Sequence, residues 1–195
     1  DFDEAVPYAG RIAEQRDLHP MPSFHTNLVE GVASYSLELL KAVPNLKRVY
    51  VPIGLGSGIC GMVCARNALG LDTEIVGVVS DQADCYAQSL LAGTCVSTET
   101  ANTFADGMAV RVPSPDALAI MQGNVARIVS VSDEEVRAAA CHYFSDSHNV
   151  AEGAGAAPLA ALLQEAPTSP DEPVAVVLSG GNIDAMLYRE ILKNA

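Results

Sequence analysis

The strongest constraint on the fold is the alternation of short apolar segments with longer segments that have helical spacing. Four of the short segments are predicted strands, at residues 48–53, 74–79, 127–131 and 174–178. They are apolar along most of their length, which is typical of strands covered on both faces. Because helical segments separate them, the sequence predicts an α/β protein in which a mostly parallel, twisted sheet has helices on both faces.

Helical periodicity and capping residues place helices between these strands. Asn27, with Glu30 three residues later, is the predicted N-cap of one helix, and Ser132 with Glu135 forms a predicted capping box at another. Pro158 is compatible with its helix only in the first turn. Four predicted helices cover residues 3–15, 84–91, 116–121 and 155–163. Two more begin at residues 27 and 184, another follows a turn at 54–61 and continues to 69, and the last runs from 132 to 144. Residues 166–173 are a predicted surface linker.

The charge balance excludes several classes of partner. Acidic residues number 24 and basic residues 11, so the net charge is −13. This argues against nucleic acid and anionic membranes as partners, because binding to either needs clustered Lys and Arg. No run of about eighteen apolar residues is present, and the acidic start Asp1-Phe2-Asp3-Glu4 is unlike a targeting signal. We therefore expect a soluble protein without nucleic-acid or membrane partners.

The five cysteines form no CxxC pair and no zinc-like cluster. Cys60 and Cys64 lie four residues apart and would share one face of a helix. We interpret this spacing as two small packed side chains rather than as a metal or redox site. An odd number of cysteines without a disulfide framework indicates reduced thiols, and hence a cytoplasmic protein.

Two glycine-rich segments directly follow predicted strands. Gly54-Leu55-Gly56-Ser57-Gly58 comes after the first strand and before a helix, and Ser179-Gly180-Gly181-Asn182 comes after the last. Ligands of parallel sheets bind beyond the carboxyl ends of the strands, so we expect both segments to face one crevice. The glycine turn can offer several backbone N–H groups and a helix N-terminus, which predicts a bound phosphate or another anion.

Part of this turn also matches a dinucleotide-binding pattern, as Gly56-x-Gly58-x-x-Gly61. The match is incomplete, because Ile53-Gly54-Leu55 precede the first glycine and only Asp81 could be the acidic residue of the next strand. A nicotinamide-dependent oxidoreductase is therefore an alternative, and a non-catalytic phosphate-binding module is another. Ser179 favours a different cofactor, because an unshielded hydroxyl can hydrogen-bond a heteroaromatic nitrogen without protonating it.

Four motifs occur in a fixed order along the chain. They are Gly54-Leu55-Gly56-Ser57-Gly58, Ala105-Asp106-Gly107-Met108-Ala109, Ala151-Glu152-Gly153-Ala154-Gly155 and Ser179-Gly180-Gly181-Asn182-Ile183-Asp184. Together they resemble the threonine/serine dehydratase and serine racemase family of pyridoxal-phosphate enzymes, which has the tryptophan-synthase-β-like fold. The resemblance covers essentially the whole chain, and it is to the C-terminal part of the family's catalytic unit.

The resemblance implies pyridoxal 5'-phosphate as the cofactor, within the large domain of a fold type II enzyme. The implied reaction is the β-elimination (deamination) of L-threonine or L-serine to a 2-oxoacid and ammonia. By the same resemblance, the cofactor phosphate would be held by the backbone of Gly54, Leu55, Gly56, Ser57 and Gly58, the pyridine nitrogen would face Ser179, and Asp106 and Glu152 would lie near the cofactor and substrate.

The resemblance also implies a domain organisation. Residues 1–25 correspond to the end of the family's small domain and its return segment, and residues 26–195 to the large cofactor-binding domain. A homodimer or homotetramer is expected. The sequence ends at Ala195 without a C-terminal regulatory domain, which favours a catabolic enzyme over a biosynthetic one.

Two features depart from the family. Its cofactor-binding lysine lies in a Ser-x-Lys-x-Arg motif upstream of this sequence, and Lys41, Lys47 and Lys193 are not in that context. We therefore assign no catalytic residue in this chain and expect it to be inactive alone. The glutamate that helps to bind a divalent cation in racemase-like members corresponds to Val78, although Asp84 is retained. Because a cation needs several oxygen ligands, we expect no metal site.

Overall fold

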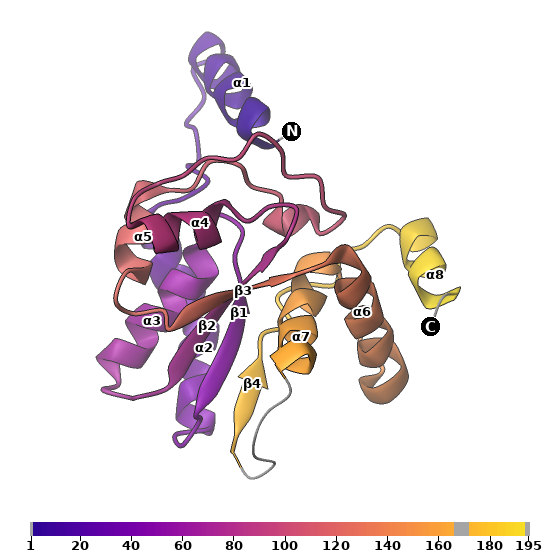
Figure 1. The fold of residues 1–195 in the computed structure, drawn as a ribbon. Helices are drawn as coiled ribbons and strands as arrows, with labels where there is room; N and C mark the ends of the chain where they lie inside the picture. The colour runs from indigo at the N-terminus through magenta and orange to yellow at the C-terminus, as the bar shows by residue number, and fades with distance from the viewer. Residues whose placement is uncertain (1, 166–171, 194–195) are drawn as a thin grey trace.

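The computed structural model describes residues 2–165 and 172–193, and it has the α/β architecture that the sequence predicts (Figure 1). The strands are β1 (Arg48–Pro52), β2 (Glu74–Ser80), β3 (Arg127–Val131) and β4 (Val174–Val176). The helices are α1 (Phe2–Gln15), α2 (Thr26–Ala42), α3 (Ser57–Ala68), α4 (Cys85–Ala92), α5 (Pro115–Met121), α6 (Asp133–Ser147), α7 (Gly153–Glu165) and α8 (Ala185–Lys193), with a 3-10 turn η1 at Asp106–Met108. Each predicted strand and helix is present, and most ends are shifted by up to three residues. The exception is α3, which begins at Ser57, inside the segment 54–61 that was predicted to be a turn.

The four strands form one parallel sheet in the order β3-β2-β1-β4. β1 pairs in parallel with β2, where Arg48 lies opposite Glu74, and with β4, where Arg48 lies opposite Val174. The predicted parallel sheet is therefore confirmed. Because β1 and β4 are direct neighbours, the segments that follow them leave the same edge of the sheet side by side.

Helices cover both faces of the sheet, as predicted. Residues of α2, α3, α4 and α5 form a core on one face, and residues of α6, α7 and α8 form a second core on the other. Strand residues alternate between the two, so that Val49 and Val51 belong to the first core and Tyr50 to the second, each at most 1% exposed. Burial of one such side chain contributes about 1.5–3 kcal/mol. Among the described helices, none is long and apolar enough to cross a membrane.

Two predictions about helix ends are wrong, for local reasons. His25 rather than Asn27 caps α2, because its Nδ1 accepts the Asn27 N–H at 3.1 Å and the helix begins one residue earlier. α7 begins at Gly153, so Pro158 lies in the second turn and not in the first. Pro158 lacks the N–H that would bond the carbonyl of residue 154. Burial of most of α7 in the second core compensates for this loss.

Other end predictions have clearer outcomes. The capping box of α6 is confirmed, since the Ser132 hydroxyl accepts the Glu135 N–H at 3.3 Å and the Glu135 carboxylate accepts the Ser132 N–H at 2.7 Å. β4 is shorter than predicted, although the Val177 N–H still donates to the Tyr50 carbonyl at 3.0 Å. Residues 166–171 of the predicted linker at 166–173 lie outside the described residues.

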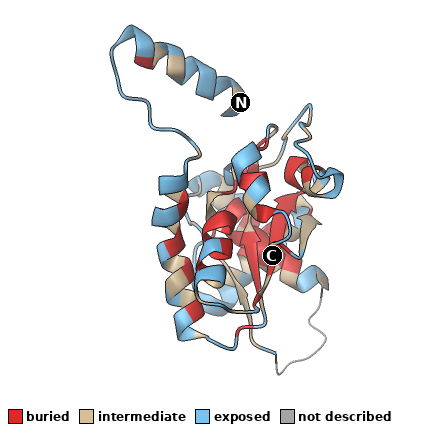
Figure 2. Cartoon of the chain, turned by 90° about the vertical axis from the view of Figure 1, so that its left-hand side faces the viewer, coloured by how far each residue is buried: buried red, intermediate tan, exposed pale blue. Residues whose placement is uncertain are grey.

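The first helix, α1, lies apart from the two layers and is joined to α2 by an extended segment (Figures 1 and 2). Ala13 is its one buried residue within the described range, and Val6 and Tyr8 are 44% and 60% exposed. A contact with the rest of the chain is made by Asp3, whose carboxylate accepts the backbone N–H of Arg111 at 3.0 Å. Most apolar side chains of α1 are therefore open to solvent.

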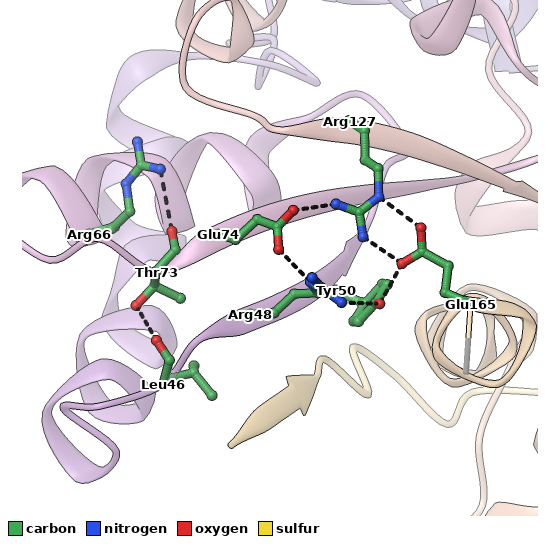
Figure 3. A network of polar contacts seen from close by, with 8 residues as sticks. All are labelled: Leu46, Arg48, Tyr50, Arg66, Thr73, Glu74, Arg127 and Glu165. Carbon is green, nitrogen blue, oxygen red and sulfur yellow. Dashed lines mark hydrogen bonds and ion pairs between the residues drawn. The ribbon is translucent and has the colours of Figure 1, made fainter. Parts of the chain in front are cut away.

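A network of ion pairs joins the amino ends of three strands (Figure 3). Arg48 of β1 and Arg127 of β3 both bind the carboxylate of Glu74 in β2. Arg127 also donates hydrogen bonds of 2.7 and 2.6 Å to Glu165 at the end of α7, and the Tyr50 hydroxyl donates to the same carboxylate at 2.5 Å. Two guanidinium groups thus face two carboxylates, so the network is neutral overall.

This network predicts how stability depends on pH. Hydrogen bonds from Arg127 hold the pKa of Glu165 below its usual range. Its contribution is therefore complete above the unfolded-state pKa of about 4.3 and is lost as the pH falls through the lower folded-state pKa. At neutral pH we expect Glu165→Gln to lower the free energy of unfolding by about 1–2 kcal/mol, with the difference narrowing in acid. Urea unfolding across this pH range measures the difference.

The control for this experiment is Glu14→Gln, a change at an exposed position of α1. It should leave the pH dependence of stability unchanged. A Glu165→Gln protein with the same stability and the same pH profile as the wild type would contradict the prediction.

Candidate functional site

A cavity of about 610 Å³ opens at the carboxyl edge of the sheet, opposite the ion-pair network. Its wall includes the whole glycine turn that follows β1, together with Ser179 after β4 and Glu152 before α7. Since β1 and β4 pair directly, these segments meet although they lie far apart in the sequence. The residues of the wall that matter here are Tyr35, Gly54, Leu55, Gly56, Ser57, Gly58, Gly107, Glu152 and Ser179.

Backbone N–H groups of the glycine turn are the main donors in the cavity. Within residues 2–165 and 172–193, the amides of residues 54–58 donate to no protein acceptor, whereas the Cys60 N–H is bonded to the Gly56 carbonyl at 3.0 Å. α3 begins at Ser57, so the partial positive charge of a helix N-terminus adds to these donors. Such a group of donors fits an anion, and a phosphate in particular.

Two glycines of the turn are required by its geometry. A Cβ at Gly54 would come within 2.3 Å of the Gly107 carbonyl oxygen. Gly56 has a φ of +99°, in the left-handed region, and a Cβ there would lie 2.8 Å from Cε of Met121. A side chain at either position would displace the turn or its neighbours. Glycine therefore allows the turn to expose bare backbone to the cavity.

Glu152 holds the segment that carries Ser179. Its backbone N–H donates to the Gly180 carbonyl at 3.1 Å, and its carboxylate accepts the Asn182 N–H at 3.1 Å. A Cβ at Gly180 would lie 2.4 Å from the Glu152 carboxylate, which explains the glycine after the serine. The exposed Ser179 has no side-chain hydrogen bond to any described residue, so its hydroxyl is available to a ligand.

Asp106 does not reach the wall of the cavity. Its side chain is exposed, and its Oδ1 accepts the N–H of Gly107 at 2.8 Å, so it stabilises its own turn. Gly107 lines the cavity at this point instead. Val78 and Asp84 are the two residues that were compared with the family's divalent-cation site. Val78 is fully buried in the sheet, and Asp84 accepts a hydrogen bond from Gln88 at 2.8 Å. No group of three or more His, Cys, Asp or Glu in the described part of the chain could hold a metal ion.

No described lysine lines the cavity. Lys47 directly precedes β1, and its N–H donates to the Pro173 carbonyl at 2.9 Å, at the amino edge of the sheet. Lys41 lies in the last turn of α2, and Lys193 ends α8. The cavity wall thus carries no amine, and Glu152 is its one charged residue among those described.

Two tyrosines that no sequence motif indicates take part in the site. Tyr35 of α2 lines the cavity, and its hydroxyl donates to the Gly58 carbonyl at 3.3 Å. The hydroxyl of Tyr86 in α4 donates to the Leu55 carbonyl at 2.7 Å. Neither tyrosine lies in a glycine motif or at a strand end. Only the packing of α2 and α4 around the turn brings them to it, so no local signal marks them.

The close approach of Gly54 to Gly107 predicts a large effect of one added methyl group. We expect Gly54→Ala to lower the free energy of unfolding by about 1–3 kcal/mol and to abolish phosphate binding, because the new Cβ meets backbone that cannot rotate away. Gly31→Ala is the matched control, since a Cβ there meets nothing within 4 Å. It should be neutral or stabilising by up to about 1 kcal/mol. Urea unfolding and titration with inorganic phosphate measure both changes, and equal behaviour of the two variants would refute the prediction.

Known proteins are similar to this chain in sequence and in fold. Residues 1–180 match a family described as pyridoxal-phosphate dependent enzyme. The L-threonine ammonia-lyase of Thermotoga maritima is 32% identical over 194 residues, which are 98% of this chain and 48% of that protein. The L-threonine ammonia-lyase of Geobacter sulfurreducens is 35% identical over 185 residues, which are 94% of this chain and 46% of that protein. The chain therefore spans about half the length of the curated relatives it matches.

A solved structure agrees with the predicted fold. The processed form of threonine deaminase isoform 2 from Solanum lycopersicum superimposes with a TM-score of 0.91 and 26% identity, over 100% of this chain and 57% of that one. The predicted fold type is thereby confirmed. The family match decides against the dinucleotide-binding alternative, and the glycine turn is the element that fits a cofactor phosphate. By its sequence and its fold, the chain belongs to the pyridoxal-phosphate dependent enzyme family.

Proposed function

We propose that this chain is the cofactor-binding part of an enzyme that deaminates L-threonine or L-serine to a 2-oxoacid and ammonia. The observation that carries the proposal is one cavity lined both by the glycine turn and by Ser179. Among the described residues, the amides of 54–58 have no acceptor and the Ser179 hydroxyl has no partner. The relatives named L-threonine ammonia-lyase support the reaction, since they match along 94% or more of this chain.

The residues of the cavity have distinct roles in this proposal. The glycine turn binds the phosphate of pyridoxal 5'-phosphate through backbone donors, and Ser179 hydrogen-bonds the pyridine nitrogen. When bound, this cofactor supplies an electron sink for the substrate carbon that loses its proton. A serine hydroxyl, unlike a carboxylate, does not stabilise a proton on that nitrogen. Ser179 therefore leaves the ring a weaker electron acceptor, which favours prompt elimination. Glu152 acts by orienting the segment that carries Ser179.

The proposal divides the reaction between this chain and the rest of the protein. Elimination needs a base at the α-carbon, and no described lysine lies at the cavity. We assign the base to the family's lysine, which lies in the part of the relatives that this chain does not span. Residues 1–25 would belong to a smaller unit and residues 26–195 to the cofactor-binding domain, in keeping with the separate position of α1. The cytoplasmic location, the homodimer or homotetramer and the catabolic type stay predictions.

The assignment of Ser179 predicts a selective effect on cofactor binding. Ser179→Ala should leave the affinity for inorganic phosphate unchanged and weaken the binding of pyridoxal 5'-phosphate by about five- to tenfold, since one hydrogen bond to the ring is lost. Both affinities are measured by titration of the 195-residue chain. Ser34→Ala, at an exposed position of α2, is the control and should change neither. Equal cofactor affinity of Ser179→Ala and wild type would remove Ser179 from the site.

The division of the reaction predicts that this chain alone does not release a 2-oxoacid from threonine or serine. The purified chain is incubated with pyridoxal 5'-phosphate, reduced with borohydride and mapped by mass spectrometry, while 2-oxoacid is assayed. We expect no turnover and no stoichiometric labelling of a single lysine, because Lys41 and Lys47 lie at the other end of the sheet. Turnover with one fully labelled lysine would refute the proposal. Restoration of activity by the upstream segment of a relative would support it, and cofactor binding without turnover even then would favour a non-catalytic module.

A further inference from the structure

Tyr86 anchors one end of the glycine turn from outside the cavity. This side chain is 1% exposed, and its hydroxyl donates to the Leu55 carbonyl at 2.7 Å while accepting the Ser114 N–H at 2.9 Å. Ser114 is itself fixed as the N-cap of α5, where its side chain accepts the Ala117 N–H. The Leu55 carbonyl is therefore held by a group that is bonded on both sides, at the junction of α4, α5 and the turn.

Tyr35 anchors the other end of the turn. It comes from α2, on a different side of the turn from α4, and its hydroxyl donates to the Gly58 carbonyl at 3.3 Å. Burial raises the pKa of both tyrosines. Their hydroxyls thus remain protonated at neutral pH, and both continue to donate to the turn.

The two anchors determine where the turn's N–H groups point. In a planar trans peptide unit, the C=O and the following N–H point in opposite directions. A Leu55 carbonyl directed at the buried Tyr86 turns the Gly56 N–H away from the core. A Gly58 carbonyl held by Tyr35 fixes Gly58 at the start of α3, and the Gly58 N–H, which has no acceptor among the described residues, lies at the cavity.

Preorganisation matters here because glycine does not restrict its own backbone. Glycine can occupy more of backbone dihedral space than any other residue, and it loses the most conformational freedom on ordering. The turn contains Gly54, Gly56 and Gly58, yet its donors are useful only if they converge. Contacts from other elements must therefore supply the rigidity that the glycines lack.

We propose that Tyr86 and Tyr35 are positioning residues of the phosphate site, which orient the amides of Gly56 and Gly58 by holding the carbonyls of Leu55 and Gly58. The inference rests on the proposed cofactor site and adds to it the groups that set its affinity. Tyr86 acts without touching the ligand, since it is buried behind the turn and does not line the cavity.

The test uses the 195-residue chain with inorganic phosphate as the probe. Tyr86→Phe and Tyr35→Phe each remove one hydroxyl and keep the ring, and each should raise the Kd for phosphate about tenfold, which equals about 1.4 kcal/mol. Amide ¹H–¹⁵N spectra give a readout that a packing role alone would not move. The Gly56 response to phosphate should be diminished in Tyr86→Phe, and the Gly58 response in Tyr35→Phe.

Tyr143→Phe is the matched control. The Tyr143 hydroxyl is buried on α6 and has no hydrogen-bond partner among the described residues, so its removal should change neither phosphate affinity nor the amide responses. Circular dichroism and urea unfolding check that each variant is folded. If Tyr86→Phe leaves the variant unfolded, Tyr35→Phe carries the test alone.

The possible results distinguish a failure of the proposed cofactor site from a failure of the positioning role alone. Wild-type chain that does not bind phosphate would overturn the cofactor site and this inference together. Wild-type chain that binds phosphate, with folded Tyr→Phe variants that bind it equally well and keep the amide responses, would overturn the positioning role and leave the proposed function intact. A Kd raised about tenfold in the Phe variants, and unchanged in Tyr143→Phe, is the result we expect.

Discussion

The parallel pairing of β1 with β4 is the interaction on which the candidate site depends. The two strands are adjacent, although more than half of the chain separates them in the sequence. Their common direction brings the glycine turn and Ser179 to one edge, and α2, α4 and α7 then pack around that edge. If β4 were moved to any other place in the sheet, the turn would keep its donors, but Ser179 would no longer line the same cavity.

Charged side chains pair with one another at the amino end of the sheet, whereas the carboxyl end relies on backbone dipoles. At the amino end, Arg48, Arg127, Glu74 and Glu165 neutralise one another through direct ion pairs. At the carboxyl end, a protein with a net charge of −13 has the proposed anion site, whose described wall contains no lysine or arginine. Backbone dipoles make this possible, because several N–H groups and a helix N-terminus attract an anion without any formal charge. The polarity of the site is thus independent of the overall charge of the chain.

Local sequence patterns predict the structure correctly where one residue type has one physical use. The four apolar strands, the glycine turn and the Ser132–Glu135 capping box were predicted from local patterns, and the structure has all of them. They are wrong where neighbours compete, as at the start of α2, where the ring of His25 takes the cap that Asn27 was expected to supply. Asp106 shows the same limit, since a match to a motif does not decide whether a carboxylate turns to the cavity or to its own backbone.

The sequence by itself determined the class of the fold and the position of the glycine turn, because alternating apolar and helical segments have few other structures open to them. The four ordered motifs gave the resemblance to the family. Only the tertiary structure decided which groups complete the site. Tyr35 and Tyr86 lie in ordinary helices, and Glu152 meets the Ser179 segment across a gap of about thirty residues of chain. Their roles arise from contacts between elements that are distant in sequence. A local sequence pattern does not determine which hydroxyl will face which carbonyl once the helices have packed.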